Sequence, residues 1–166
     1  MKKLFLMILL LISCFSINTF ANEIFEKIQL LSKVNAKEFK KLSEKDNLVS
    51  WEKELENQEF GRVELTTDKA GTIYDIKYVK VSKLDLYPQA QDLLSKLNSN
   101  YGQANCEAQG YPGIGHIGDI CTIHQKESNI VLEITTPYLP NIIDVYLLTL
   151  NITSNQLKKI NPEEKK

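Results

Sequence analysis

Apolar residues recur every three or four positions in the first third of the chain, and this spacing predicts helices there. The segment 23–55 contains no glycine or proline and is rich in strong helix formers. Asn35 and Glu38 have the spacing of a capping box, so the helix either restarts at Asn35 or runs through it. The apolar positions that set the spacing are Ile24, Ile28, Leu31 and Val34.

The pattern changes at Phe60, where valine, isoleucine, threonine and tyrosine become frequent. Residues 61–67 and 72–82 are separated by the turn-forming segment 68–71, which predicts a β-hairpin. Polar residues interrupt one side of the second strand, so we expect one face of the hairpin to be buried and the other partly wet.

A second helix is predicted after the hairpin. Pro88 suits the first turn of a helix, and Gly102 suits its end. The apolar stripe between them consists of Ala90, Leu93, Leu94, Leu97 and Tyr101.

The last third of the chain has the pattern of a sheet. Strands are expected at 120–125, 129–136 and 142–152, and the third is apolar on both faces, which is typical of a central strand. No repeat or linker divides the chain. The sequence therefore predicts an α+β domain with N-terminal helices, a β-hairpin, a helix and a three-stranded antiparallel segment, forming one sheet of roughly five strands packed by helices.

The N-terminus has the layout of a secretory signal: two lysines, an apolar core and a small residue at the end. We expect residues 1–21 to be a signal peptide cut after Ala21, residues 22–154 to form one domain, and residues 155–166 to be a flexible charged tail. The segment ending at Cys14 also resembles a bacterial lipobox, so lipidation at Cys14 is the alternative. Both routes predict export, to the periplasm or beyond, without a transmembrane helix.

Charge narrows the classes of partner. Removing residues 1–21 removes two lysines and no acid, so the 20 basic and 21 acidic residues of the chain become 18 and 21, a formal charge of −3. That balance is too mild to indicate a nucleic acid or an acidic membrane surface as partner.

Two of the three cysteines, Cys106 and Cys121, remain once Cys14 is discarded or lipidated. An even pair in an oxidising compartment predicts a disulfide. It would hold both ends of a glycine-rich segment, 107–118, which we interpret as a tethered loop.

Three kinds of chemistry compete with this interpretation and are disfavoured. Residues 113–118 match the letters of a dinucleotide fingerprint, but they precede a strand and not a helix. His116 and His124, together with the cysteines, lack the spacing of zinc fingers, so neither a metal nor another cofactor is expected. A thiol nucleophile would require a cysteine that the disulfide consumes, and the chain has no G-x-S-x-G or H-E-x-x-H motif.

The sequence therefore favours a small exported protein without catalytic activity, of the inhibitor, immunity-protein or envelope-accessory type, that binds a protein partner through the tethered loop. The alternative is a carrier of a small apolar ligand held between sheet and helices. The candidate partner-binding residues are Tyr111, Pro112, Ile114, His116 and Ile117, and the candidate cavity residues are Tyr74, Tyr78, Leu94 and Tyr146.

Overall fold

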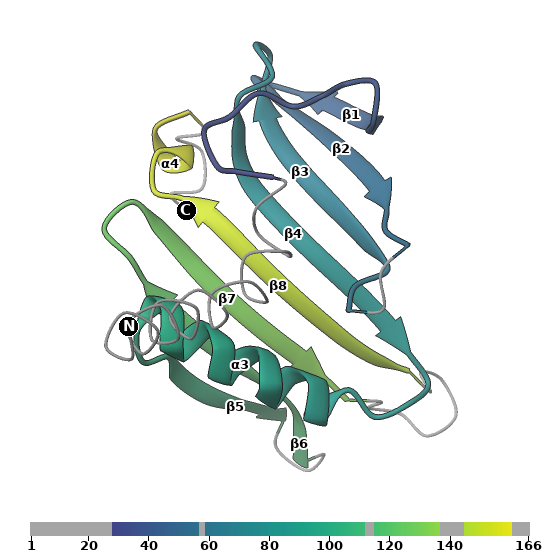
Figure 1. Ribbon diagram of the computed structural model, residues 1–166, viewed down its shortest axis with the longest axis vertical. Helices are drawn as coiled ribbons and strands as arrows, with labels where there is room; N and C mark the ends of the chain where they lie inside the picture. The colour runs from purple at the N-terminus through teal and green to yellow at the C-terminus, as the bar shows by residue number, and fades with distance from the viewer. Residues whose placement is uncertain (1–27, 57–58, 112–114, 137–144, 161–166) are drawn as a thin grey trace, which may run out of the picture.

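The computed structural model describes residues 28–56, 59–111, 115–136 and 145–160. It contains an eight-stranded antiparallel sheet crossed on one face by a helix (Figure 1). In chain order the elements are β1 (Lys40–Lys45), β2 (Leu48–Glu54), β3 (Arg62–Asp68), β4 (Ile73–Ser82), α3 (Tyr87–Tyr101), β5 (Asn105–Tyr111), β6 (Gly115–His124), β7 (Ser128–Thr135), β8 (Tyr146–Ser154) and α4 (Leu157–Ile160).

The sheet consists of two antiparallel meanders joined at the centre. The strand order is β1-β2-β3-β4-β8-β7-β6-β5, so the second meander runs back from β8 to the edge strand β5. β4 and β8 pair from Asp75↔Thr153 to Ser82↔Tyr146. Helix α3 connects the end of β4 to β5 and lies across the second meander (Figure 1).

The predicted α+β fold class is wrong, because the described part of the protein is mostly β, with one eight-stranded sheet. The predicted N-terminal helical segment contains no helix among its described residues: residues 28–39 form turns and an isolated bridge, and residues 40–54 form β1, β2 and the turn between them. Residues 23–27 lie outside the described residues. Helix propensity is a weak local preference, and tertiary pairing overrides it here. β2 pairs along its whole length with β3, from Leu48↔Asp68 to Glu54↔Arg62.

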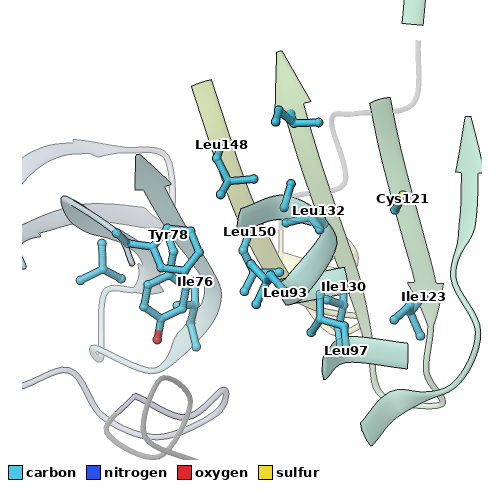
Figure 2. Close-up of a cluster of buried hydrophobic side chains, with 14 of the residues drawn as sticks. Ile76, Tyr78, Leu93, Leu97, Cys121, Ile123, Ile130, Leu132, Leu148 and Leu150 are labelled. Carbon is cyan, nitrogen blue, oxygen red and sulfur yellow. The ribbon is translucent and has the colours of Figure 1, made fainter. Parts of the chain in front are cut away.

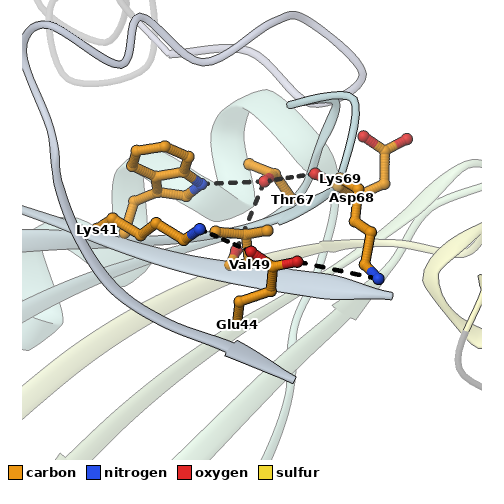
Figure 3. A network of polar contacts seen from close by, with 7 residues as sticks. Lys41, Glu44, Val49, Thr67, Asp68 and Lys69 are labelled. Atoms are coloured by element: carbon orange, nitrogen blue, oxygen red, sulfur yellow. Dashed lines mark hydrogen bonds and ion pairs between the residues drawn. The ribbon is translucent and has the colours of Figure 1, made fainter. Parts of the chain in front are cut away.

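The contacts on one face of β2 explain why this segment forms a strand and not a helix. Val49 and Trp51, two residues apart, both face the apolar side of the sheet, and Val49 is 5% exposed. The Trp51 indole donates a hydrogen bond to Thr67 Oγ1 at 3.0 Å, and that hydroxyl donates to the Asp68 carbonyl at 2.9 Å (Figure 3). The buried side chains of β2 therefore alternate with a period of two, although the same residues also fit a helical period.

Two local signals in this region lead to turns. The predicted capping box forms an isolated turn, in which the Asn35 amide donates to Glu38 Oε1 at 2.7 Å. Asp46 and Asn47 form the two-residue connection between β1 and β2, and Asp46 has a φ of 55°. Aspartate and asparagine tolerate positive φ, which makes the pair a hairpin signal that the helical interpretation passed over.

The other elements agree more closely with the pattern. The predicted hairpin is β3 and β4, the predicted helix is α3, and Gly102 ends that helix with a φ of 97°. β8 is central, as predicted, because it pairs with both β4 and β7. β5 was not predicted as a strand.

The apolar core lies between α3 and the sheet. Ala90, Leu93 and Leu97 are the buried residues of the helix, and they meet the apolar faces of β4, β6, β7 and β8 (Figure 2). On the sheet side the fully or nearly fully buried positions include Ile76, Tyr78, Ile130, Leu132, Leu148 and Leu150.

Side chains one position along each strand point to the opposite face of the sheet. On β8 these are Leu147, Thr149, Asn151 and Thr153. Residues 155–160, assigned above to a charged tail, include the one-turn helix α4, and the Asn155 side-chain amide donates to the Lys126 carbonyl at 3.1 Å. Residues 161–166 lie outside the described residues.

Candidate functional site

The predicted disulfide is confirmed: Cys106 and Cys121 are bonded, 15 residues apart in sequence. They lie directly opposite each other on β5 and β6, with 4.0 Å between their Cα atoms. Such short separations belong to the non-hydrogen-bonded pairs of an antiparallel ladder. The bond therefore fixes the edge strand β5 to the sheet.

The segment interpreted as a tethered loop is mostly a β-hairpin. β5 and β6 pair from Asn105↔Thr122 to Tyr111↔Gly115, and only residues 112–114 between them are outside the described part. Of the candidate partner-binding residues, Pro112 and Ile114 fall on those undescribed positions. Tyr111 ends β5, and His116 and Ile117 lie on β6.

The structure explains why residue 118 is a glycine, which the match of residues 113–118 to a dinucleotide fingerprint did not. A Cβ at this position would lie 2.1 Å from the Ile134 carbonyl oxygen on β7. Just beside it, the Thr136 N–H and hydroxyl both donate to the Ile117 carbonyl, at 2.8 and 3.1 Å. The glycine permits close approach of β6 and β7 where their ladder ends.

A polar cluster stands where β6 meets the start of α3. His116 Nε2 lies 2.9 Å from Asp119 Oδ1, and the His116 ring lies 6.3 Å from the Tyr87 ring between centroids. Burial, followed by the nearby Asp119 carboxylate, raises the pKa of Tyr87 to about 12. The phenol therefore stays neutral and able to donate a hydrogen bond at any physiological pH.

An apolar pocket of about 200 Å³ opens beside this cluster, between α3 and the β5–β7 end of the sheet. Leu94 and Gln91 line it from the helix, the disulfide lines it from the edge, and Asp119 supplies a carboxylate. The remaining lining residues are Tyr87, Ala90, Leu132 and Ile134. The pocket thus combines an apolar interior with a few polar groups, as ligand sites commonly do.

The edge strand next to this pocket has exposed hydrogen-bonding groups. Because Cys106 is in a non-hydrogen-bonded pair with β6, its backbone N–H and C=O, and those of Ala108 two residues on, point away from β6. Within the described residues no strand pairs with that side of β5. An unpaired edge of this kind is a template for a further strand.

The four candidate cavity residues are not brought together. Leu94 lines the pocket beside α3. Tyr78 is a core residue, 3% exposed, whose ring lies 5.3 Å from Phe60 and whose pKa is raised by burial to about 12. The Tyr74 hydroxyl donates to Asp68 at 3.4 Å, far along β4, and Tyr146 packs at the edge of the core.

The structure also describes the residues on which the disfavoured zinc and thiol hypotheses depend. Both cysteines of the zinc and thiol hypotheses are oxidised to each other, and His124 Nδ1 lies 2.7 Å from Asn129 Oδ1. The described residues include no group of three histidine, cysteine, aspartate or glutamate side chains placed to hold a metal ion. None of the helices in the described ranges has the length and apolarity to cross a bilayer.

Comparison of the chain with protein-family models, with curated proteins and with solved structures finds no match.

Proposed function

We propose that the protein is an exported, non-catalytic binding protein that adds an extended segment of a protein partner to β5. The observation that carries this proposal is the position of the apolar pocket directly beside a sheet edge with which no described strand pairs. Strand addition draws affinity from main-chain hydrogen bonds and specificity from pockets that receive alternate side chains. Both components lie side by side at β5.

The two edges of the sheet differ in a way that supports β5 as the binding edge. β1, with the sequence KKLSEK, is exposed throughout and carries three lysines, a pattern that protects an edge from pairing. β5, with the sequence NCEAQGY, carries a single charge at Glu107. The edge beside the pocket is therefore the less protected one.

The geometry also defines the chemistry of the partner segment. Cys106 and Ala108 face the α3 side of the sheet, while Glu107 faces the other side. A strand beside β5 would place every second side chain against the pocket and the intervening ones near Glu107. The expected segment alternates apolar side chains with polar or basic ones.

The disulfide has a specific role in this function. An edge strand fixed to its neighbour loses less conformational freedom when a further strand is added, and preorganisation of this kind increases affinity. An oxidising compartment would keep the bond formed. Export through the signal of residues 1–21, or anchoring through a lipid at Cys14, would place the protein in such a compartment.

Substitution of Ala108 tests the proposal. Proline at this position removes an outward-pointing N–H and leaves the hydrogen bonds between β5 and β6 in place. Tagged A108P protein should lose a partner that wild-type protein captures from its own envelope extract, whereas the matched variant A108V, which keeps the N–H, should retain it. Circular dichroism of both variants checks that the fold survives.

A captured partner supports the proposal only when its binding segment is mapped to β5. A synthetic peptide covering that segment should slow amide hydrogen exchange at Cys106 and Ala108 in the wild-type protein. Equal capture by A108P and wild type would refute strand addition at this edge.

The pocket beside α3 also supports the second candidate, a carrier of a small apolar ligand, because it is lined mostly by apolar groups. Native mass spectrometry of the purified protein distinguishes the two. A bound small molecule that is released by Leu94→Lys, with A108P showing no effect, would favour the carrier.

A further inference from the structure

A second pocket, of about 380 Å³, lies on the face of the sheet opposite α3. Its sheet side is built mainly from polar residues of neighbouring strands, and its rim is formed by the chain that leaves β8 and enters α4. The lining residues are Leu48, Thr66, Asp75, Asn129, Asn151, Thr153, Ser154, Asn155, Leu157 and Lys158. This volume is in the range of small-molecule sites.

Hydrogen-bond acceptors dominate the floor of this pocket. Asp75 Oδ1 accepts a hydrogen bond from the Thr153 hydroxyl at 2.5 Å, and the nearby Asn151 side chain acts to lower the pKa of this carboxyl. A carboxylate only accepts, so the Asn151 amide nitrogen must face Asp75. That orientation leaves Asn151 Oδ1 buried without a hydrogen-bond partner among the described residues.

A buried acceptor without a donor is costly, and such groups in native proteins call for an explanation. Desolvation adds a second cost, because burial raises the pKa of Asp75 against the lowering effects of Thr153 and Lys77. Both costs fall in one pocket, on adjacent strands. A positively charged ligand that donates hydrogen bonds to the Asp75 carboxylate would offset the cost of its desolvation.

The rest of the lining specifies the remainder of such a ligand. Lys158 places a cationic side chain on the rim, which suits an acidic group at the other end of the ligand. Leu48 and Leu157 provide apolar surface between the polar groups. The neighbouring charges on the sheet face, Lys77 and Glu64, lie opposite each other on β4 and β3.

We propose that this pocket binds a small α-amino acid with an apolar side chain. Its ammonium group donates to the Asp75 carboxylate, its carboxylate meets Lys158, and its side chain contacts Leu48 and Leu157. This site is separate from the β5 edge, since it uses the other face of the sheet.

The rim of the pocket is held in place without a ligand. His124 Nδ1 lies 2.7 Å from Asn129 Oδ1, and the Asn129 amide nitrogen donates a hydrogen bond to Asn155 Oδ1 at 2.8 Å. The Asn155 backbone N–H donates to the Glu127 carbonyl at 2.9 Å. These bonds connect the β6–β7 turn to the chain after β8, so the site is preorganised and little ordering accompanies binding.

Three probes with the same branched carbon skeleton test the proposal: L-leucine, isopentylamine, which lacks the carboxylate, and 4-methylpentanoate, which lacks the amine. Each is titrated into ¹⁵N-labelled mature protein while backbone amide signals are followed. L-leucine should shift the amides of Asp75, Asn151 and Thr153, isopentylamine should shift the same amides more weakly, and 4-methylpentanoate should leave them unchanged. Equal shifts with 4-methylpentanoate, or none with L-leucine, would overturn the assignment.

Two matched variants separate this site from general effects on the sheet face. Asp75→Asn should weaken L-leucine binding at least tenfold, about the loss expected for a charge-assisted hydrogen bond. Glu64→Gln removes a carboxylate on the same face outside the pocket and should change affinity by less than about twofold. Unchanged affinity in Asp75→Asn would overturn the role of the carboxylate.

Discussion

The two faces of the sheet use the same strands for different purposes. On the face beneath α3, Leu148 and Leu150 of β8 have no exposed area and join a continuous apolar layer. On the opposite face three of the four alternate residues of the same strand, Thr149, Asn151 and Thr153, are polar, and Asn151 holds a buried oxygen without a partner among the described residues. Neighbouring residues of one strand therefore lie in contrasting environments.

This contrast separates the source of stability from the source of binding. Burial of apolar surface beneath α3 provides most of the free energy of folding. The opposite face contributes less and retains polar groups whose burial opposes folding. Groups retained at a cost in stability are candidates for function, because functional sites are where local rules are broken.

Truncation of a leucine on each face should give the largest measurable difference. Leu150→Ala creates a cavity beneath α3 and should lower the free energy of unfolding by about 2–5 kcal/mol. Leu147→Ala removes a half-buried side chain from the opposite face and should cost about 1 kcal/mol. Urea denaturation monitored by circular dichroism measures both, and equal losses would contradict the assignment of the core to the α3 face.

Loss of the disulfide should have the next largest effect. Closing the 15-residue separation between Cys106 and Cys121 corresponds to about 3 kcal/mol in the chain-entropy account. The double variant Cys106→Ala/Cys121→Ala should lower the free energy of unfolding by about that amount and increase hydrogen exchange most in β5. A uniform increase across β1–β8 would indicate that the bond does not act locally. Reduced wild-type protein is the control for the substitutions themselves.

The sequence predicted the parts of the fold in which local preference and tertiary pairing agree. Pro88 and Gly102 bracket α3 with an apolar stripe between them, and the β3–β4 hairpin has a turn-forming connection between β-rich runs. The region of β1 and β2 was mistaken for helix because its many lysines and glutamates favour helix locally. The pairing of β2 with β3, remote information that a local pattern lacks, decides the outcome.

The candidate sites also divide into features that a local signal predicts and features that depend on tertiary pairing. The disulfide was predictable from the even pair of cysteines together with the export that the N-terminal pattern leads us to expect. The pocket beside α3 was not, since it depends on Leu94, Asp119 and Cys121 meeting from three elements. Asp75 and Asn151 were predictable only as residues on the less apolar side of their strands. Their proximity follows from the pairing of β4 with β8, which no short motif encodes.

The smallest expected effect on stability is that of Asp75→Asn, which should be a gain, whereas the substitutions above lower the free energy of unfolding. Burial raises the pKa of Asp75 above its ordinary value, so folding favours the protonated form of this carboxyl. Its contribution to stability is therefore fully present below the unfolded-state pKa and is lost as pH rises through the folded-state pKa. Asp75→Asn should consequently be slightly more stable than wild type at neutral pH, and the difference should shrink as the pH falls toward the unfolded-state pKa.

The charged neighbours of Asp75 supply the control for this prediction. Lys77 lowers the pKa of Asp75, Glu64 raises it, and Lys158 lies on the rim of the same pocket. Glu64→Gln breaks a partly exposed ion pair, in which Arg62 Nε lies 2.8 Å from Glu64 Oε1, and should lower stability by about 1 kcal/mol. Thermal unfolding of the Asp75→Asn and Glu64→Gln variants between acidic and neutral pH measures the sign of the stability change that each substitution causes. Destabilisation by Asp75→Asn at neutral pH would show that the carboxylate contributes to folding, and the contrast between the two faces would then lose its functional meaning.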